Sequence, residues 1–189
     1  MGIIRNLPLG EIDLILPEGV HTPSPSTAEL ARLLDVESGD QVLELGCGSG
    51  LLSIVAARLG AGRVIATDLD SRALSATALN AQKTGTAHTI TLYEGSWYDA
   101  LPKHDRGPFD VIIAIAPQTP GPLPFGPKYG GWDGTDHLTA IIDGAPAYLK
   151  PETGRLWIVA ISLVPVSSLL QGLRNRFGDV SIPRETERI

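Results

Sequence analysis

The segment at residues 41–50, which reads QVLELGCGSG, constrains the fold of this chain more than any other stretch. Its first five residues are mostly apolar and predict a buried strand. Three glycines follow at alternate positions, Gly46, Gly48 and Gly50, and glycine allows a tight turn and a close approach of a ligand to the backbone. Residues 49–59 have a broad apolar face and predict a helix. The usual ligand of a glycine-rich turn between a strand and a helix is a dinucleotide, so the first question is whether this spacing fits one.

The rest of the chain alternates predicted strands with predicted helices. This alternation implies a parallel sheet with helices on both faces. After the strand at 41–45, further strands are expected at 63–68, 89–95, 109–116 and 154–162. The helices are expected at 28–36, 49–59, 71–83, 138–149 and 167–177. The predicted fold class is therefore α/β, a Rossmann-like fold with a mostly parallel twisted sheet.

The two ends of the chain carry weaker signals. The apolar pieces within residues 3–16 are expected to form a small hairpin or an edge strand, and Ser26 or Thr27 to cap the first long helix. The segment DVSIPRETERI at 179–189 is expected to form a last strand. We predict a single domain over residues 1–189, with a strand-and-loop extension at 1–27. A sheet edge left without a partner would favour a homodimer.

Composition restricts the class of protein. A length of 189 residues suits one compact domain. The net charge of -6, from 15 basic and 21 acidic residues, counts against broad binding of a nucleic-acid backbone. A single cysteine, Cys47, excludes an internal disulfide and fits a reducing compartment. There is no signal-peptide pattern and no apolar run near the roughly 20 residues that a membrane helix needs, so we expect a cytoplasmic protein without membrane contact.

The glycine spacing argues against a dinucleotide. The dinucleotide fingerprint is G-x-G-x-x-G, whereas this chain has G-x-G-x-G followed by two leucines. Glu44, just before the loop, would repel a pyrophosphate and attract an ammonium group. Asp68, at the end of the second strand, stands where an acid accepts hydrogen bonds from ribose hydroxyls; the alternative is a helix N-cap, a role open also to Asp70 or Ser71. A ligand with a nucleoside at one end and an amino acid at the other is S-adenosylmethionine (SAM).

The pattern as a whole resembles the class I SAM-dependent methyltransferases, and within them the small-domain family that includes the release-factor glutamine methyltransferases. The resemblance runs from about residue 19 to residue 177. It rests on VLELGCGSGLLSIVAA at 42–57, ATDLDSRALSATALNA at 66–81, EGSWYDAL at 94–101 and the glycine-rich YGGWDGTDHL at 129–138. It implies SAM as cofactor, S-adenosylhomocysteine (SAH) as product, and no metal.

The resemblance also implies which residues hold the cofactor. Asp68 takes the place of the acid that binds the ribose, and Leu69 is expected against the adenine. Ser96 stands where the family often has an aspartate near the adenine amino group, and its hydroxyl can still accept a hydrogen bond. The full expected set is Glu44, Gly46, Cys47, Gly48, Gly50, Asp68, Leu69, Ser96, Trp97 and Ala114.

The acceptor motif departs from the family. The fourth strand typically ends in Asn-Pro-Pro-Tyr, whose asparagine and backbone carbonyl hold the planar nitrogen that receives the methyl group. This chain has Ala116, Pro117, Gln118 and Thr119 there. Ala116 has no side-chain acceptor, which argues against glutamine or adenine N-methylation in the family's manner. Gln118 offers a displaced carbonyl acceptor.

The segment at 117–136 is expected to be a substrate lid, because it contains five prolines and five glycines and leaves the end of a central strand. His137 or Asp136 could take a proton, and Tyr129 or Trp132 could stack on a flat or cationic substrate. Each also has an ordinary structural interpretation, as a cap or turn residue. The candidate catalytic residues are Ala116, Pro117, Gln118 and His137. The candidate substrate-binding residues are His21, Gln118, Tyr129, Trp132 and Asp133.

Three functions follow, in this order. The first is a methyltransferase acting on a small-molecule or peptide-sized acceptor. The second is a protein (glutamine-type) or RNA N-methyltransferase with a relocated acceptor contact, although the acidic charge disfavours nucleic acid as a partner. The third is a non-catalytic protein that binds SAM or a nucleoside. An NAD-dependent oxidoreductase is disfavoured by the glycine spacing and by Glu44.

Overall fold

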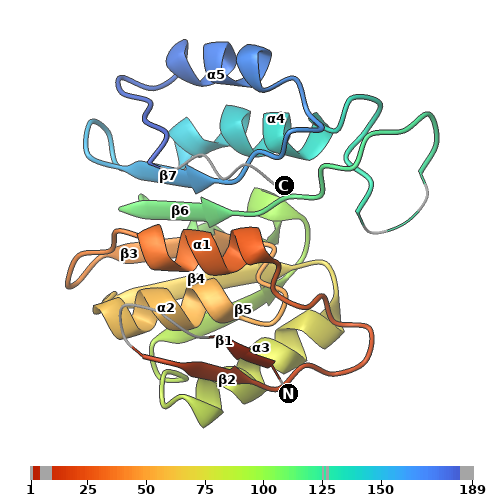
Figure 1. Cartoon of the computed structure of the whole chain (residues 1–189). Coiled ribbons are helices and arrows are strands. Elements are labelled where there is room, and N and C mark those ends of the chain that lie inside the picture. The colour runs from red at the N-terminus through yellow and green to blue at the C-terminus, as the bar shows by residue number, and fades with distance from the viewer. Residues whose placement is uncertain (1, 5–9, 125, 127, 184–189) are drawn as a thin grey trace. The chain divides into compact units, whose positions relative to one another are not determined.

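A computed structural model describes residues 2–4, 10–124, 126 and 128–183 of the chain (Figure 1). These residues fall into two compact units. Unit 1 comprises residues 1–116 and 143–159, and unit 2 comprises residues 117–142 and 160–189. The prediction of a single domain stays a prediction, and the expected lid lies entirely within unit 2.

Unit 1 is built on a five-stranded sheet whose strands all run parallel, in the order β5-β4-β3-β6-β7. The strand at 41–45, the first of the five along the chain, lies at the centre of the sheet. The turn that follows it lies at the carboxyl edge, where open parallel sheets bind ligands. The predicted parallel sheet is therefore confirmed. The strands are β3 (Gln41–Leu45), β4 (Arg63–Asp68), β5 (Ile90–Glu94), β6 (Val111–Ala114) and β7 (Arg155–Ile158).

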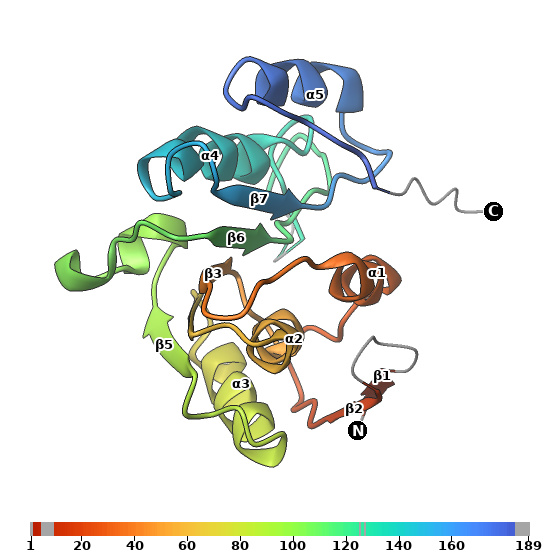
Figure 2. The same ribbon diagram turned by 90° about the vertical axis from the view of Figure 1, so that its left-hand side faces the viewer.

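Three helices of unit 1 lie on one side of this sheet (Figure 2). They are α1 (Pro25–Leu33), α2 (Leu51–Leu59) and α3 (Ser71–Lys83). The main apolar core forms where Val42, Val64 and Ile113 pack with residues of α1 and α2. The opposite face of the sheet is buried too, as expected of parallel strands, and the short 3-10 helix η1 (Trp97–Ala100) packs near β4.

The first helix begins earlier than the sequence suggested. Its N-cap is Ser24, and neither Ser26 nor Thr27 caps it. The Ser24 hydroxyl accepts from the Thr27 N–H at 3.1 Å, and the Thr27 hydroxyl accepts from the Ser24 N–H at 3.2 Å, so the two residues form a reciprocal capping box. The extension predicted at 1–27 therefore overlaps the first turn of α1, where Pro25 suits the first helical position because no N–H is required there.

The chain termini differ from the expectation in one respect. At the N-terminus, β1 (Gly2–Ile4) and β2 (Ile12–Leu14) pair antiparallel in a separate two-stranded sheet, so the predicted hairpin is confirmed. At the C-terminus, residues 179–183 form no strand, and residues 184–189 lie outside the described part of the chain. The prediction of a last strand is wrong for 179–183, where Pro183 has no N–H to donate to a ladder.

Unit 2 contains most of α4 (Asp136–Gly144) and all of α5 (Val166–Arg174). The helix predicted at 138–149 ends at residue 144, and a 3-10 turn, η3 (Ala145–Ala147), replaces its second half, because Pro146 has no N–H with which to continue the α-helix. No helix among the described residues is long and apolar enough to cross a membrane.

Candidate cofactor site

The glycine loop, residues 46–50, joins β3 to α2 at the carboxyl edge of the sheet. Gly46, Gly48 and Gly50 have φ angles of 78°, 54° and 82°, a left-handed conformation that other residues rarely adopt. A Cβ atom on Gly50 would lie 2.7 Å from the Cγ2 of Thr77, so α3 closes that side. A Cβ atom on Gly48 would meet nothing within 4 Å. The loop therefore presents an open backbone at Gly48 on which a ligand can lie.

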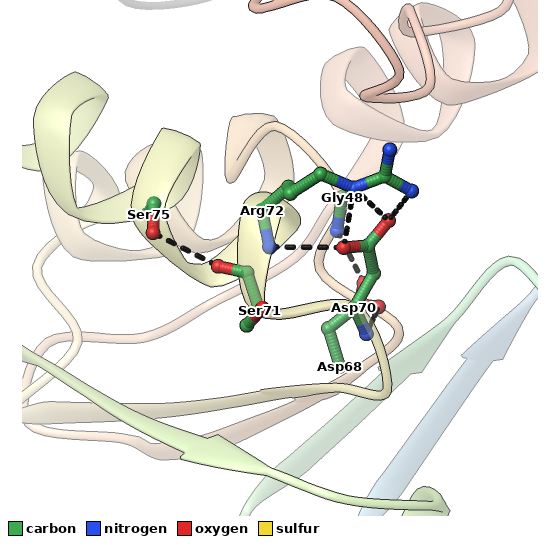
Figure 3. A network of polar contacts seen from close by, with 6 residues as sticks. All are labelled: Gly48, Asp68, Asp70, Ser71, Arg72 and Ser75. Atoms are coloured by element: carbon green, nitrogen blue, oxygen red, sulfur yellow. Dashed lines mark hydrogen bonds and ion pairs between the residues drawn. The ribbon is translucent and has the colours of Figure 1, made fainter.

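Neighbouring elements of unit 1 hold the loop in this shape. The N–H groups of Gly46 and Cys47 both donate to the carbonyl oxygen of Thr67, at 2.8 and 2.9 Å. The Gly48 N–H donates to Oδ2 of Asp68 at 2.9 Å (Figure 3), and the Gly48 carbonyl accepts from the Thr77 hydroxyl at 3.2 Å. The loop is thus ordered by β4 and α3 before any ligand arrives, which reduces the entropy that binding must overcome.

Asp68 lies at the end of β4, where its carboxylate faces the loop. Oδ1 accepts from the Asp70 N–H at 2.9 Å, in addition to the bond between Oδ2 and Gly48. An ionised carboxylate has about four acceptor positions, so these two bonds leave room for ligand hydroxyls. The N-cap of α3 is Asp70, whose side chain accepts from the Arg72 N–H at 2.9 Å (Figure 3). The alternative interpretation of Asp68 as the helix cap is therefore wrong.

Glu44 lies one residue before the end of β3, and its side chain is only 3% exposed. Its carboxyl group accepts a hydrogen bond from the Ser53 hydroxyl of α2. Burial raises the pKa of Glu44 to about 8, although the bond to Ser53 acts in the opposite direction. Near neutral pH the carboxyl group is therefore largely protonated in the ligand-free protein. The expected attraction for an ammonium group requires the loss of this proton, which a cation bound nearby would favour.

The other predicted cofactor residues also belong to unit 1. Leu69 is 68% exposed and directly follows Asp68. Trp97 has a φ of 42°, and a Cβ atom on Gly46 would lie 3.4 Å from its Cζ3, so its ring packs beside the loop. Ser96 is the N-cap residue of η1, and Ala114 ends β6.

Cys47 is 5% exposed, and its sulfur lies 3.4 Å from the Thr77 hydroxyl oxygen, whose one proton is shared between this sulfur and the Gly48 carbonyl. Burial raises the pKa of the Cys47 thiol, which keeps it protonated and unreactive. Its contribution to the glycine loop is therefore its backbone N–H and its packing.

Most of the predicted substrate residues belong to unit 2. Gln118 is 4% exposed, and its Oε1 accepts from the Ile161 N–H at 3.0 Å. Oδ1 of Asp133 accepts from the N–H and the hydroxyl of Thr135, at 3.0 and 2.6 Å, and these bonds lower the pKa of Asp133. Both side chains therefore have structural partners inside unit 2.

The aromatic candidates of unit 2 differ in exposure. Trp132 is 75% exposed and borders an open hollow of about 180 Å³, which Pro120, Gly121 and Pro122 complete. Tyr129 is half-buried and pairs through its backbone with Thr119.

The remaining candidates are divided between the two units. Ala116 is buried and ends the first segment of unit 1, and Pro117 is the first residue of unit 2. His137 is half-buried in the first turn of α4, close to Asp136 in the chain. His21 is exposed and belongs to unit 1. Among the described residues, no group of three or more His, Cys, Asp or Glu side chains is arranged to hold a metal ion.

Two residues that contact the loop were missed at the level of sequence. Thr77 and Asn80 are fully buried on α3, and they bond to the carbonyl oxygens of Gly48 and Ser49. Their spacing places them on the same helix face as the buried alanines Ala73 and Ala76. Two polar residues on the otherwise alanine-lined face of a helix indicate a hydrogen bond to a neighbouring segment, since a buried polar group needs a partner.

Comparison with known proteins agrees with this geometry. A family profile described as ribosomal protein L11 methyltransferase (PrmA) matches residues 23–116. The release factor glutamine methyltransferase of Xylella fastidiosa (strain 9a5c) is 34% identical over 156 residues, covering 74% of this chain and 55% of the relative. The ribosomal protein L11 methyltransferase of Pelotomaculum thermopropionicum is 37% identical over 114 residues, covering 56% of this chain and 35% of the relative. The chain thus spans about half the length of the release factor relative, and less of the other.

Solved structures give the same picture. The ribosomal protein L11 methylase of Lactobacillus delbrueckii subsp. bulgaricus superposes with a TM-score of 0.64 at 26% identity, covering 85% of this chain and 73% of that structure. The precorrin 8W decarboxylase of Methanobacterium thermoautotrophicum has the same TM-score and identity, covering 86% of this chain and 77% of that structure. These likenesses confirm the predicted Rossmann-like fold class.

Proposed function

The chain belongs to the class I SAM-dependent methyltransferases, and from this premise we propose that unit 1 binds SAM at the glycine loop and that the protein transfers the methyl group to an acceptor, leaving SAH. The observation that carries the proposal is the pairing of Gly48 and Asp68. An open backbone position and an acidic side chain lie 2.9 Å apart, N to Oδ2, at the carboxyl edge of the sheet.

The residues of unit 1 fit the parts of this cofactor. Asp68 has acceptor positions for ribose hydroxyls, and the exposed Leu69 beside it offers an apolar surface for a base. The backbone at Gly48 offers space for the amino-acid end, and Glu44 would balance an ammonium group once it loses its proton. SAM, when bound, supplies an activated methyl group and its own leaving group. The protein's remaining task is to orient the acceptor and exclude water.

The binding half of the proposal is tested by substituting Asp68. We expect Asp68→Ala to weaken SAM affinity about a hundredfold in isothermal titration calorimetry, the worth of two charge-assisted hydrogen bonds. Asp68→Asn retains a carbonyl acceptor and should lose less. Asp99→Ala, at an exposed acidic residue of η1, is the matched control and should bind as the wild type does. Equal affinity for wild type and Asp68→Ala would show that the cofactor site lies elsewhere.

We propose further that the acceptor is carried on a protein or peptide, and is not a glutamine amide held in the manner of the glutamine methyltransferases. The names of the relatives, which specify release factor and ribosomal protein L11, support a protein acceptor over a free small molecule. Two observations argue against the family's amide contact. Ala116 has no side-chain acceptor. The side-chain oxygen of Gln118, Oε1, already accepts a hydrogen bond from the Ile161 N–H.

The acceptor class is tested by transfer of a labelled methyl group from SAM into cell extract, followed by separation of protein, nucleic acid and small molecules. Label that enters protein with the wild type and not with Asp68→Ala would support the proposal. Label in the small-molecule or nucleic-acid fraction would overturn the protein acceptor and leave methyl transfer intact. SAM binding without label in any fraction would instead favour the non-catalytic binder.

A further inference from the structure

Asn80 lies in the last turn of α3 and is fully buried, with both of its polar side-chain atoms bonded. Its Oδ1 accepts from the Ile15 N–H at 2.7 Å. Its Nδ2 donates to the Ile15 carbonyl at 2.9 Å and to the Ser49 carbonyl at 2.9 Å. One side chain therefore joins the backbone near the N-terminal hairpin to the backbone of the glycine loop.

The N-terminal side of this link is a segment that we call the strap, residues 13–19. The strap runs alongside α3 in the opposite direction, and Figure 1 shows the N-terminal hairpin beside that helix. Asp13 forms an ion pair with Lys83 at 2.7 Å, at the end of α3. Gly19 lies against Arg72, since a Cβ atom on Gly19 would lie 2.6 Å from Nη1. Ile15, bonded to Asn80, falls between these two contacts.

On the loop side of the link, two side chains of α3 bond to backbone carbonyl oxygens of the glycine loop. Asn80 holds the Ser49 carbonyl, and Thr77, one turn earlier on the same face of α3, holds the Gly48 carbonyl. Gly48 is the open position of the loop. A ligand that lies on the backbone at Gly48 would therefore stabilise the bond between Ser49 and Asn80, and through Asn80 the bonds to Ile15.

We propose that Asn80 is a positioning residue for the SAM site, which couples the order of the strap to the order of the glycine loop. The inference rests on the proposed function, because it concerns the same ligand. An asparagine amide suits this place, since it supplies one acceptor and two donors to three backbone groups. An aspartate would set a carboxylate against two carbonyl oxygens, and an alanine would leave the three groups without this partner.

The first test uses the wild-type protein with SAH as the probe. Hydrogen–deuterium exchange is measured with and without SAH, and SAH binding is measured separately by calorimetry. We expect SAH to slow exchange at the amides of both the glycine loop and Ile15, on the order of tenfold for Ile15. If SAH does not bind, the proposed function fails and the inference fails with it. If SAH binds and protects the loop while Ile15 exchanges as before, the inference alone is overturned.

The second test separates coupling from a general structural role. In Asn80→Ala, saturating SAH should still protect the glycine loop but should no longer protect the strap, and SAH affinity should fall about tenfold. Lys83→Ala is the matched control, because it removes a partly exposed ion pair that contributes little to the order of the strap and leaves the Asn80 bonds in place, so its SAH affinity should change less than about twofold. Protection of the strap that survives in Asn80→Ala would contradict the proposal. Should this variant fail to fold, the wild-type exchange measurement still decides.

Discussion

The molecule has two glycine-rich segments, and their glycines serve opposite purposes. In the glycine loop of unit 1, a side chain on Gly48 would enter open space. In the segment at 117–136 of unit 2, a Cβ atom on Gly130 would lie 2.7 Å from the Cα of Gln118, and one on Gly134 would overlap the Gln118 carbonyl oxygen and lie 2.9 Å from Val164. The first segment keeps its backbone accessible at Gly48, whereas the second packs Gly130 and Gly134 against neighbouring atoms of unit 2.

The hydrogen bonds show the same contrast. Side chains of other elements hold the glycine loop, namely Asp68, Thr77 and Asn80. The segment at 117–136 is held largely by its own backbone: the Gly130 N–H donates to the Thr119 carbonyl at 2.9 Å and the Gly121 N–H to the Gly131 carbonyl at 3.1 Å. A high content of glycine and proline predicts a loop in both cases, but only the atoms around each glycine show whether the loop is built for a ligand or for its own packing.

The largest expected effect concerns Glu44, which leads into the glycine loop. Its pKa is about 8 in the folded protein, against an ordinary value of 4.5. Between these pH values the folded chain binds more protons than the unfolded chain, so the free energy of unfolding falls as pH rises from about 4.5 to about 8. We expect wild type to lose on the order of 4 kcal/mol relative to Glu44→Gln over this window, measured by urea unfolding at pH 5, 7 and 9.

Glu44→Gln is the appropriate reference because glutamine keeps an acceptor for Ser53 and does not titrate in this range. The difference between the two proteins cancels the contribution of the other ionisable groups. Parallel stability profiles for the two proteins would show that Glu44 is ionised in the folded state near neutral pH, and that the glycine loop is preceded by a permanent negative charge.

The second effect concerns Gly134, in unit 2. Its φ of 83° strains any other residue, and the added Cβ would overlap the Gln118 carbonyl. We expect Gly134→Ala to lower the stability of unit 2 by about 3 kcal/mol, seen as faster hydrogen exchange over residues 117–142. Gly126 is the matched control in the same segment, since it also has positive φ, 140°, but a Cβ there would meet nothing within 4 Å. Equal losses for Gly134→Ala and Gly126→Ala would mean that unit 2 does not pack as tightly as described.

Local signals predicted the elements around the glycine loop well. The bounds of β4 and α3 agree with the prediction residue by residue, because β4 is an apolar run between a glycine and an aspartate, and α3 is alanine-rich with Asp70 as its cap. The parallel sheet followed from the alternation of such elements. The helix predicted at 138–149 is too long, because its apolar spacing continues past Pro146, where the α-helix cannot.

The hydrogen-bond partners of polar side chains were predicted less well, because they are distant in the sequence. Oε1 of Gln118 bonds to Ile161, 43 residues later, and the predicted contact of Gln118 with substrate stays a prediction. Asn80 was not singled out, yet it bonds to Ile15, 65 residues earlier. Asp68 was predicted to bind a ribose because a motif relates strand, loop and acid; that role stays a prediction, and the bond from Gly48 shows only that the carboxylate lies beside the loop. A motif allows a hypothesis about the role of a polar residue. Where a tertiary contact alone determines the hydrogen-bond partner, the sequence gives little information about it.

The third prediction concerns Gln118 itself. Gln118→Met keeps the length of the side chain and removes the acceptor for the Ile161 N–H, so we expect unit 2 to lose about 2 kcal/mol. The local measure is the exchange rate of the Ile161 amide, which should rise on the order of tenfold or more, while SAM affinity stays at the wild-type value. An unchanged Ile161 amide together with loss of methyl transfer would contradict this prediction and support Gln118 as a substrate contact.

The smallest expected effect on stability comes from the most accessible glycine. Gly48→Ala meets no neighbouring atom, so it should cost only the left-handed conformation, about 1 kcal/mol, a third of the loss expected at Gly134. The same methyl group would point into the space assigned to the cofactor, so SAM affinity should fall more than tenfold in calorimetry. A small stability loss with a large affinity loss is the signature of a glycine kept for a ligand. If Gly48→Ala bound SAM as tightly as wild type, the open side of the loop would have to face solvent, and the contrast between the two glycine-rich segments would concern packing alone.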